Sequence, residues 1–215
     1  MLFIFYIIIC LILLGLIYYF CDGIDDIFNY TFDMYYDVIE IENILSRDEC
    51  NELIQLSITN GLKNSEVWNE DDSTTLDYSH RISQQAWLEN NHPLVDKIRM
   101  LSEKYTGFPM EKQELLQVVK YDVGGKFESH YDAWVYGKYN GENGQRKCTF
   151  MIFLNDDFEG GTTEFPYINK IVYPSIGKAV IFKNTDSYQN VIFQSLHRGN
   201  IITRGNKWIC TVWSH

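Results

Sequence analysis

The chain has 215 residues, of which 46% are hydrophobic and 15% aromatic, and its formal net charge is −11. This length and composition suffice for one domain with a sizeable core and argue against a disordered chain. Because phosphate binding requires a basic surface, the acidic balance argues against a nucleic-acid partner.

The first predicted element is a membrane anchor at residues 1–21, which contain no charged side chain. About 20 apolar residues span a bilayer as a helix, and Tyr18 and Tyr19 lie near one end, where an interfacial aromatic belt would fall. A cleaved signal sequence is the alternative, but the apolar stretch is long and has neither a basic start nor an obvious cleavage site. We favour an uncleaved transmembrane helix, followed by an acidic, tyrosine-rich tether at residues 22–38.

The flank after the anchor bears on its orientation. Asp22, Asp25 and Asp26 are acidic and no Lys or Arg accompanies them, which is compatible with a lumenal domain. Asn29 begins an Asn-Tyr-Thr glycosylation sequon, which agrees with that placement. We therefore expect a single-pass protein of the endoplasmic reticulum membrane, with residues 39–215 as its lumenal domain.

A capping box predicts the first helix of the domain. Ser46 is followed three residues later by Glu49, so the helix should begin there and run to about Asn60. Gly61 is suited to the C-cap. A polar loop at residues 64–79 should follow.

A second helix is predicted at residues 94–105, where apolar side chains recur with the helical period. From Leu115 onward the pattern changes to short β-like runs, separated by turn signals that contain glycine. The predicted strands are Leu115–Tyr121, Thr149–Leu154, Ile168–Tyr173, Ala179–Lys183, Val191–Leu196 and Trp208–Trp213.

Many short strands at even spacing predict a sandwich or barrel. We therefore expect a mainly β fold with flanking helices (α+β), in which the helices pack on one face. Its helical N-terminal part would be residues 39–113. Its core would be a double-stranded β-helix, or jelly roll, at residues 114–215.

Three side chains in this core are of the kind that binds metals. His130 and Asp132 are two positions apart, and His197 follows 67 residues after His130. Residues i and i+2 of a strand share a face, so His130 and Asp132 could bind one ion together, with His197 supplied by another strand. Two histidines and a carboxylate on one side of Fe(II) leave positions open for a cosubstrate and O2. A lone His-x-Asp is usually a surface feature, but the complete ordered set favours a metal site.

Lys207 lies ten residues after His197 and completes the set. 2-Oxoglutarate chelates iron through its C1 carboxylate and keto oxygen, and its C5 carboxylate then needs a buried cation, which a lysine can supply. A solvated strand lysine is the alternative. Because Trp208, Ile209 and Cys210 follow, the strand is largely apolar, and a lysine in it should have a partner.

Five cysteines form an odd and sparse set that does not fit a disulfide scaffold. Cys10 lies in the predicted anchor. Cys148 and Cys210 lie in apolar strand-like runs and are expected to be buried as small hydrophobic side chains.

Four ordered blocks carry a resemblance to a known family. Residues 114–132 read Glu-Leu-Leu-Gln-Val-Val-Lys-Tyr-Asp-Val-Gly-Gly-Lys-Phe-Glu-Ser-His-Tyr-Asp, and residues 154–166 contain Leu-Asn-Asp and Gly-Gly-Thr-Thr-Glu-Phe-Pro. The other blocks are residues 174–182 and 195–215. With these blocks, residues 39–215 resemble the collagen-type branch of the prolyl 4-hydroxylase family of 2-oxoglutarate- and Fe(II)-dependent dioxygenases. The motifs of that family are Glu-x-Leu-Gln-Val-x-x-Tyr-x-x-Gly-x-x-Tyr/Phe-x-x-His-x-Asp, Leu-Asn-Asp and Gly-Gly-x-Thr-x-Phe-Pro.

The resemblance implies a procollagen-proline 4-dioxygenase-like enzyme, which hydroxylates peptidyl proline at C4 while 2-oxoglutarate is decarboxylated to succinate. It implies Fe(II), 2-oxoglutarate, O2 and ascorbate as cofactors or cosubstrates, and a proline-containing peptide or protein as substrate. The implied iron ligands are His130, Asp132 and His197, and Lys207 would bind the C5 carboxylate.

Further roles rest on the resemblance alone. The implied cosubstrate residues are Tyr121, Thr149 and Trp213, and the implied substrate or supporting residues are His215, Arg81 and Tyr136. The loop at residues 134–146 follows Asp132 closely, and we expect it to close over a proline-rich peptide. The polyproline II shape of such a peptide suits an aromatic-lined groove.

Two alternative functions stay open. One is the same oxygenase chemistry on another protein side chain such as lysine, because the triad and Lys207 serve chemistry and not substrate choice. The other is a non-catalytic, membrane-tethered jelly-roll binding module, which the loss of any one of these four residues would have favoured. An iron halogenase is disfavoured, because Asp132 occupies the position that a halide would need. The sequence predicts no particular oligomeric state.

Overall fold

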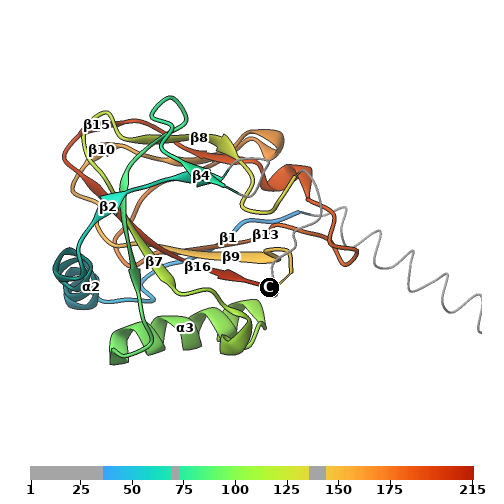
Figure 1. Cartoon of the computed structure of the whole chain (residues 1–215), viewed down its shortest axis with the longest axis horizontal. Helices are drawn as coiled ribbons and strands as arrows, with labels where there is room; N and C mark the ends of the chain where they lie inside the picture. Colours follow the sequence, from blue (N-terminus) through green and yellow to red (C-terminus); the bar gives the residue numbers. More distant parts are fainter. Residues whose placement is uncertain (1–35, 69–72, 136–143) are drawn as a thin grey trace, which may run out of the picture. The chain divides into compact units, whose positions relative to one another are not determined.

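Two antiparallel sheets face each other in the computed structural model, which describes residues 36–68, 73–135 and 144–215 (Figure 1). The predicted anchor, the glycosylation sequon and most of the predicted tether lie outside these residues. Within the described ranges, no helix combines the length and the apolar character that crossing a bilayer requires.

The larger sheet has seven strands in the order β1–β13–β9–β16–β7–β6–β2. Their bounds are β1 (Ile39–Ile41), β2 (Lys63–Asn64), β6 (Gln84–Leu88), β7 (Leu116–Tyr121), β9 (Cys148–Phe153), β13 (Ala179–Lys183) and β16 (Lys207–Ser214). Each neighbouring pair is antiparallel.

The smaller sheet has five strands in the order β12–β11–β14–β8–β5, again all antiparallel. Their bounds are β5 (Arg81–Ile82), β8 (Lys126–His130), β11 (Thr163–Phe165), β12 (Lys170–Val172) and β14 (His197–Gly199). Two short ribbons pair β3 (Val67–Trp68) with β4 (Thr74–Thr75) and β10 (Glu159–Gly160) with β15 (Ile202–Arg204). From β7 to β16 the chain passes repeatedly between the two sheets, so the prediction of a mainly β jelly roll is confirmed.

The two long helices begin with side-chain caps. At the start of α2 (Arg47–Asn60), Ser46 and Glu49 form both bonds of a capping box, at 2.9 and 3.2 Å. At the start of α3 (Pro93–Thr106), the His92 side chain accepts a hydrogen bond from a backbone N–H of the first turn. Both helix predictions are confirmed to within a residue or two.

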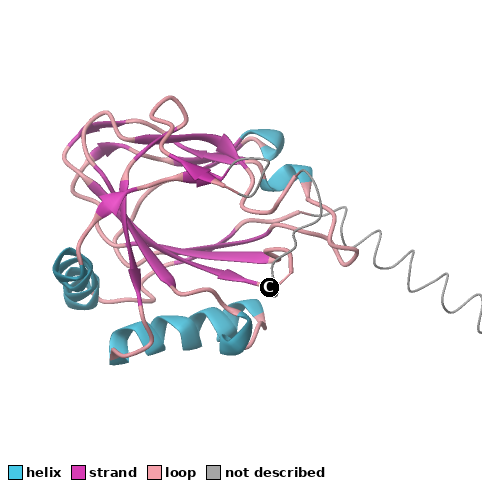
Figure 2. Cartoon of the chain, in the orientation of Figure 1, coloured by secondary structure: helices cyan, strands magenta, loops and turns pink. Residues whose placement is uncertain are grey.

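Both helices lie on the side of the larger sheet that faces away from β8 (Figure 2). Their apolar side chains and those of the sheet form one buried cluster. It includes Cys50 and Leu53 of α2, Val95 and Ile98 of α3, and Val118, Phe150, Ile152, Cys210 and Val212 of the sheet. The prediction that the helices pack on one face is therefore confirmed.

The opposite face of the larger sheet lines a chamber between the two sheets. Because successive side chains of a strand point to opposite faces, β16 contributes to both environments. Lys207, Ile209, Thr211 and Trp213 line the chamber, whereas Trp208, Cys210 and Val212 belong to the helix-covered cluster.

Two predicted strands differ from the structure. The run Val191–Leu196 contains the 3-10 helix η3 (Phe193–Ser195), and the next strand begins only at His197. Phe193 is 70% exposed, so the apolar run that suggested a strand is partly a surface feature. Within Ile168–Tyr173 the strand covers only β12, since the 3-10 helix η2 (Pro166–Ile168) precedes it.

The N-terminal part of the domain is also less helical than predicted. Residues 64–79 contain the β3–β4 ribbon, and β1, β2, β5 and β6 contribute to the two sheets. Four of these six strands have only two residues, too short for an alternating pattern, and neighbouring strands hold them. The 3-10 helix η1 (Met110–Lys112) connects α3 to β7.

Candidate functional site

A cleft of about 630 Å³ opens beside the smaller sheet and adjoins the inner chamber, which has a volume of about 50 Å³. The two spaces share part of their walls. The shared residues are Arg81, Gln117, Phe127, His130, Asp132 and Trp213. A ligand in the chamber would therefore lie next to a larger molecule in the cleft.

The three predicted metal ligands converge where the cleft meets the chamber. His130 ends β8 and His197 begins β14, and the two lie directly opposite each other in the antiparallel pair. Asp132 lies past the end of β8, so the loop, and not strand alternation as predicted, places its side chain. One ligand atom of each residue lies within 4.8 Å of the other two.

The hydrogen bonds of the two histidines fix which ring nitrogen is free. His130 Nδ1 lies 2.8 Å from the carbonyl oxygen of Glu128, and His197 Nδ1 lies 2.9 Å from that of Ser195. Because a carbonyl oxygen only accepts, each Nδ1 donates its hydrogen and each Nε2 keeps a lone pair. These Nε2 atoms lie 3.7 and 3.9 Å from the oxygens of Asp132. Such a donor set fits Fe(II).

The charges of the site favour the protonation states that bind a metal. Burial and the neighbouring His197 hold the pKa of His130 well below its usual value. Burial alone would raise the pKa of Asp132, but His197, His130 and the Thr149 hydroxyl outweigh burial and hold it at about 2. At neutral pH His130 is therefore neutral and Asp132 is ionised.

Lys207 is the buried cation that the sequence predicts. It is 2% exposed, and its Nζ donates to the carbonyl oxygen of Gly161 at 2.7 Å. Among the described residues Lys207 forms no ion pair with a carboxylate, and burial lowers the pKa of Lys207 to about 7. A buried cation that lacks a counter-ion fits an anionic ligand in the chamber.

Arg81 brings a second buried cation to the same walls. Its guanidinium carbon lies 4.6 Å from the centroid of the Phe127 ring, and its Nε donates to Ser83 Oγ at 3.0 Å. It lines the chamber together with Tyr121, the cross-strand neighbour of Lys207. Burial lowers the pKa of Arg81 and raises that of Tyr121. Arg81 and Lys207 together make the chamber suited to an anion.

Thr149 lies in β9 on the chamber wall, but its hydroxyl has protein partners. It donates to Asp132 Oδ2 at 2.6 Å and accepts from Asn184 Nδ2 at 2.8 Å. A hydroxyl has one hydrogen, so a bond donated to 2-oxoglutarate would require the bond to Asp132 to break. The predicted contact of Thr149 with the cosubstrate stays a prediction.

Trp213 lines both the cleft and the chamber. Its indole N–H is buried and has no acceptor among the described residues. The guanidinium carbon of Arg146 lies 3.9 Å from the centroid of its ring. Trp213 thus offers a rigid wall and a donor that a bound molecule could use.

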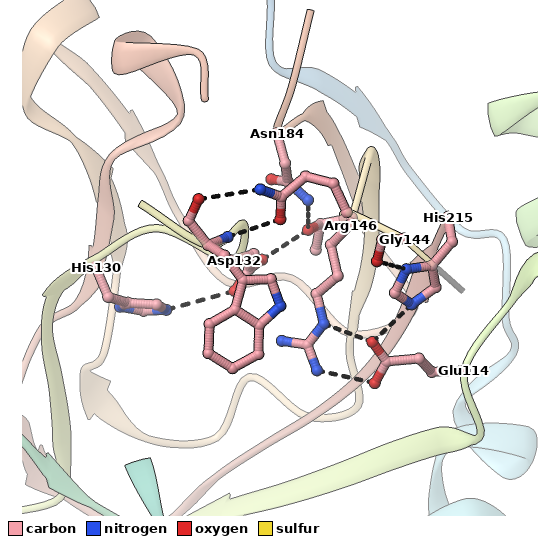
Figure 3. A network of polar contacts seen from close by, with 10 residues as sticks. Glu114, His130, Asp132, Gly144, Arg146, Asn184 and His215 are labelled. Carbon is pink, nitrogen blue, oxygen red and sulfur yellow. Dashed lines mark hydrogen bonds and ion pairs between the residues drawn. The ribbon is translucent and has the colours of Figure 1, made fainter. Parts of the chain in front are cut away.

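His215 reaches the cleft only through other residues (Figure 3). Its Nδ1 lies 2.8 Å from the carbonyl oxygen of Gly144, and its Nε2 lies 3.0 Å from Glu114 Oε1. Glu114 in turn accepts two hydrogen bonds from Arg146, at 2.5 and 2.8 Å. Arg146 lines the cleft, so His215 supports its wall from behind.

The sequence analysis missed several residues of this site, and one residue that it predicted is not described by the structure. Tyr136 and most of the predicted lid lie outside the described residues. Glu114, Arg146 and Asn184 were not predicted. Glu114 opens the first motif block, which could have marked it, whereas Asn184 follows an apolar strand and carries no local signal.

Several known proteins are similar to this chain in sequence. Residues 116–215 match the model of the 2OG-Fe(II) oxygenase superfamily. The chain is 34% identical over 197 residues to "Probable prolyl 4-hydroxylase 3" of Arabidopsis thaliana, with 80% of this chain and 67% of that protein covered. It is 32% identical over 194 residues to "Prolyl 4-hydroxylase 5" of the same plant, with 80% and 66% covered.

A solved structure shares the fold. The viral collagen prolyl hydroxylase vCPH from Paramecium Bursaria Chlorella virus-1, in its 2OG complex, aligns with a TM-score of 0.66 and 25% sequence identity. The alignment covers 82% of this chain and 94% of that chain. The likeness therefore covers most of this chain and is not confined to the residues around the candidate metal ligands.

Proposed function

Because this chain belongs to the prolyl 4-hydroxylase family of 2-oxoglutarate- and Fe(II)-dependent oxygenases, we propose that it hydroxylates proline at C4 in a peptide or protein. The observation that carries the proposal is the convergence of His130, Asp132 and His197 beside a chamber that contains Lys207. The chemistry of the chamber supports 2-oxoglutarate as the ligand, since this dianion needs both a metal and a distant cation.

Each of these residues has a task in the proposed reaction. The oxidant is O2: with iron bound to supply the redox chemistry, one oxygen atom would enter the proline C–H bond and the other would enter the succinate that forms as 2-oxoglutarate loses CO2. His130 and His197 would hold Fe(II) through Nε2, and Asp132 through a carboxylate oxygen. Lys207 would pair with the C5 carboxylate, and because both groups are buried there, their attraction is stronger than in water.

The walls of the cleft support a peptide substrate. Trp87, Tyr131 and Trp134 give it an aromatic lining, to which Val67 and Val135 add apolar surface. Aromatic grooves bind polyproline II segments, because such segments lose little conformational entropy on binding. The relative with the 2OG complex is named a collagen prolyl hydroxylase, which supports a collagen-like sequence as the substrate.

We extend the proposal to the location of the enzyme. The uncharged segment 1–21 would anchor it in the endoplasmic reticulum membrane, with the domain in the lumen. Ascorbate would support turnover there by keeping the iron reduced. The acidic flank at residues 22–26 and the sequon at Asn29 support this orientation.

The test is turnover by the full chain with Fe(II), 2-oxoglutarate and ascorbate. Succinate would be measured with and without poly-proline and Pro-Pro-Gly-type peptides, together with a mass gain of one oxygen on the peptide. We expect peptide-stimulated succinate formation and 4-hydroxyproline in the peptide. His130→Ala should abolish both, whereas Lys97→Met, a change in an exposed lysine, should affect neither.

Other outcomes would redirect the proposal. Succinate without oxidised proline would retain the oxygenase and move the search to other substrates, of which lysine-containing peptides come first. Absence of both turnover and iron binding would contradict the enzymatic proposal and favour a tethered binding module.

A further inference from the structure

A continuous hydrogen-bonded chain lies behind the candidate metal ligands (Figure 3). Asn184 Nδ2 donates to Thr149 Oγ1 at 2.8 Å, and Thr149 Oγ1 donates to Asp132 Oδ2 at 2.6 Å. Asn184 is completely buried and lines neither the cleft nor the chamber. It can therefore influence the site only through the side chain that it contacts.

The direction of this chain follows from counting hydrogens. The ionised carboxylate of Asp132 only accepts, so Thr149 must give it the single hydroxyl hydrogen. The oxygen of Thr149 can then accept from the residue behind it, and the NH2 group of Asn184 is the donor there. A side chain at position 184 without a donor would leave the Thr149 hydroxyl held only by its bond to Asp132.

The backbone holds the amide of Asn184 in place from both sides. Asn184 directly follows β13, and its N–H donates to the carbonyl oxygen of Lys147 at 2.8 Å. Its own carbonyl oxygen accepts from the N–H of Ile192 at 2.9 Å. The donor that orients Thr149 is thus on a fixed frame, outside the space that ligands occupy.

The bond from Thr149 makes the two oxygens of Asp132 different. Oδ2 receives the hydroxyl hydrogen and lies 3.9 Å from His197 Nε2, whereas Oδ1 lies 3.7 Å from His130 Nε2 and has no hydrogen bond among the described residues. Because the hydrogen bond occupies a lone pair of Oδ2, Oδ1 is the stronger donor for a metal held by both histidines. Binding through one oxygen leaves more positions open than chelation by both, and cosubstrate and O2 need those positions.

We propose that Asn184 and Thr149 are positioning residues that orient the Asp132 carboxylate so that it binds the metal through a single oxygen, an inference that rests on the proposed function. Groups that orient a metal ligand typically change metal affinity about 10- to 100-fold when they are removed. Neither residue is expected to touch the metal or the substrate.

The first experiment measures Mn(II) binding to the full chain without O2, by electron paramagnetic resonance. Thr149→Val keeps the shape of the side chain and removes the hydroxyl, whereas Thr149→Ser keeps the hydroxyl. We expect Thr149→Val and Asn184→Leu each to weaken binding by about tenfold, and Thr149→Ser to stay within about twofold of wild type. Co(II) absorption spectra should change in the first two variants and not in the third.

A double-mutant cycle separates positioning from general packing. If Asn184 acts through Thr149, then Asn184→Leu should have almost no effect on Mn(II) affinity in the Thr149→Val background. Additive effects of the two substitutions, or wild-type affinity and spectra in Thr149→Val, would overturn the proposal. Thermal unfolding checks that each variant folds, and Thr149→Ala and Asn184→Ala replace any variant that does not.

The controls distinguish this inference from the proposed function. Wild type should bind Mn(II), and His130→Ala should not. If wild type also fails to bind, the proposed function itself fails. If wild type binds, His130→Ala does not, and Thr149→Val binds as wild type does, only the positioning chain is refuted.

Discussion

The two faces of the larger sheet use the same strands for opposite purposes. On the face that α2 and α3 cover, β16 places Trp208, Cys210 and Val212 in an apolar cluster. On the chamber face, the alternate residues of the same strand include Lys207 and Thr211. One face therefore stabilises the fold by burying apolar surface, whereas the other keeps polar groups buried for ligands that arrive later.

The residues that stabilise the fold and the residues that would bind ligands are therefore neighbours in the sequence. They are separated because successive side chains of a strand point to opposite faces of the sheet. Similar substitutions at neighbouring positions of one strand should therefore have different effects on the free energy of unfolding and on ligand binding. Substitutions on the helix-covered face should destabilise the fold, whereas substitutions on the chamber face should weaken binding without destabilising the fold. Four changes, from the largest expected effect to the smallest, test this separation.

The largest effect should follow the loss of a metal ligand on the chamber side. His130→Ala removes one of the two imidazoles, and chelation of the metal removes the ion itself. Since a bound metal contributes several kcal/mol to such reactions, we expect hydroxylation to fall by at least about 1,000-fold. Anaerobic Fe(II) binding and succinate formation measure the effect. Retained turnover in His130→Ala would show that the metal is held elsewhere.

Lys207→Met should weaken cosubstrate binding and strengthen the fold at the same time. Removal of one partner of a buried charge pair costs about 2–5 kcal/mol, so 2-oxoglutarate affinity should fall by about 100-fold. The ligand-free protein should gain about 1–4 kcal/mol in free energy of unfolding, since an apolar side chain replaces an uncompensated cation. Isothermal titration and urea unfolding test the two parts. Lower stability would contradict the proposed cost of burying Lys207 without a counter-ion.

Two matched substitutions at adjacent positions of β16 compare how the two faces of the sheet contribute to stability. Val212→Thr places a hydroxyl in the helix-covered cluster and should cost about 1–3 kcal/mol in free energy of unfolding. Thr211→Val makes the reverse change on the chamber face and should alter that free energy by less than about 0.5 kcal/mol. Equal costs for the two substitutions in urea unfolding would remove the distinction between the faces.

The smallest effect is a dependence of cosubstrate binding on pH. Burial lowers the pKa of Lys207 to about 7, well below its value in the unfolded chain. The unfolded state therefore binds more protons than the folded state above pH 7, and the stability contribution of Lys207 rises with pH from about 7 to about 10. Binding of 2-oxoglutarate needs the protonated amine, so its affinity should fall as pH rises above 7.

Titration calorimetry with Mn(II) present measures this coupling. At pH 8 binding should take up nearly one proton, which appears as a heat that depends on the buffer. Lys207→Arg keeps its charge throughout this range, so its remaining binding should lose the pH dependence. Proton-independent binding by the wild type would exclude Lys207 as the titrating partner.

Local patterns explain what could be predicted from the sequence. The capping box at Ser46 and the largely apolar strand predicted at Trp208–Trp213 involve residues within a few positions of each other, and both appear in the structure as expected. The His-x-Asp spacing of His130 and Asp132, followed by the distant His197, predicted a common metal site, because this order of ligands is typical of a site with two histidines and one carboxylate. The run Val191–Leu196 misled because its apolar residues are partly exposed.

Contacts between distant positions explain what could not be predicted. Glu114 and His215 hydrogen-bond each other although 101 positions separate them, and Asn184 meets Thr149 across 35 positions. Such pairs depend on which strands become neighbours, which no single segment encodes. The resemblance to a family pointed to Thr149, but only the structure gives the hydroxyl its two partners.

The three buried cysteines among the described residues make it possible to measure how often the helix-covered face opens. Cys50, Cys148 and Cys210 are free, and burial raises the pKa of Cys148 to about 12 and that of Cys50 to about 11. Thiol reagents attack the thiolate, so they can modify these side chains only when the helices part from the sheet. In a chain with Cys10 and Cys21 replaced by serine, the rate of labelling would report how often the helices separate from the sheet.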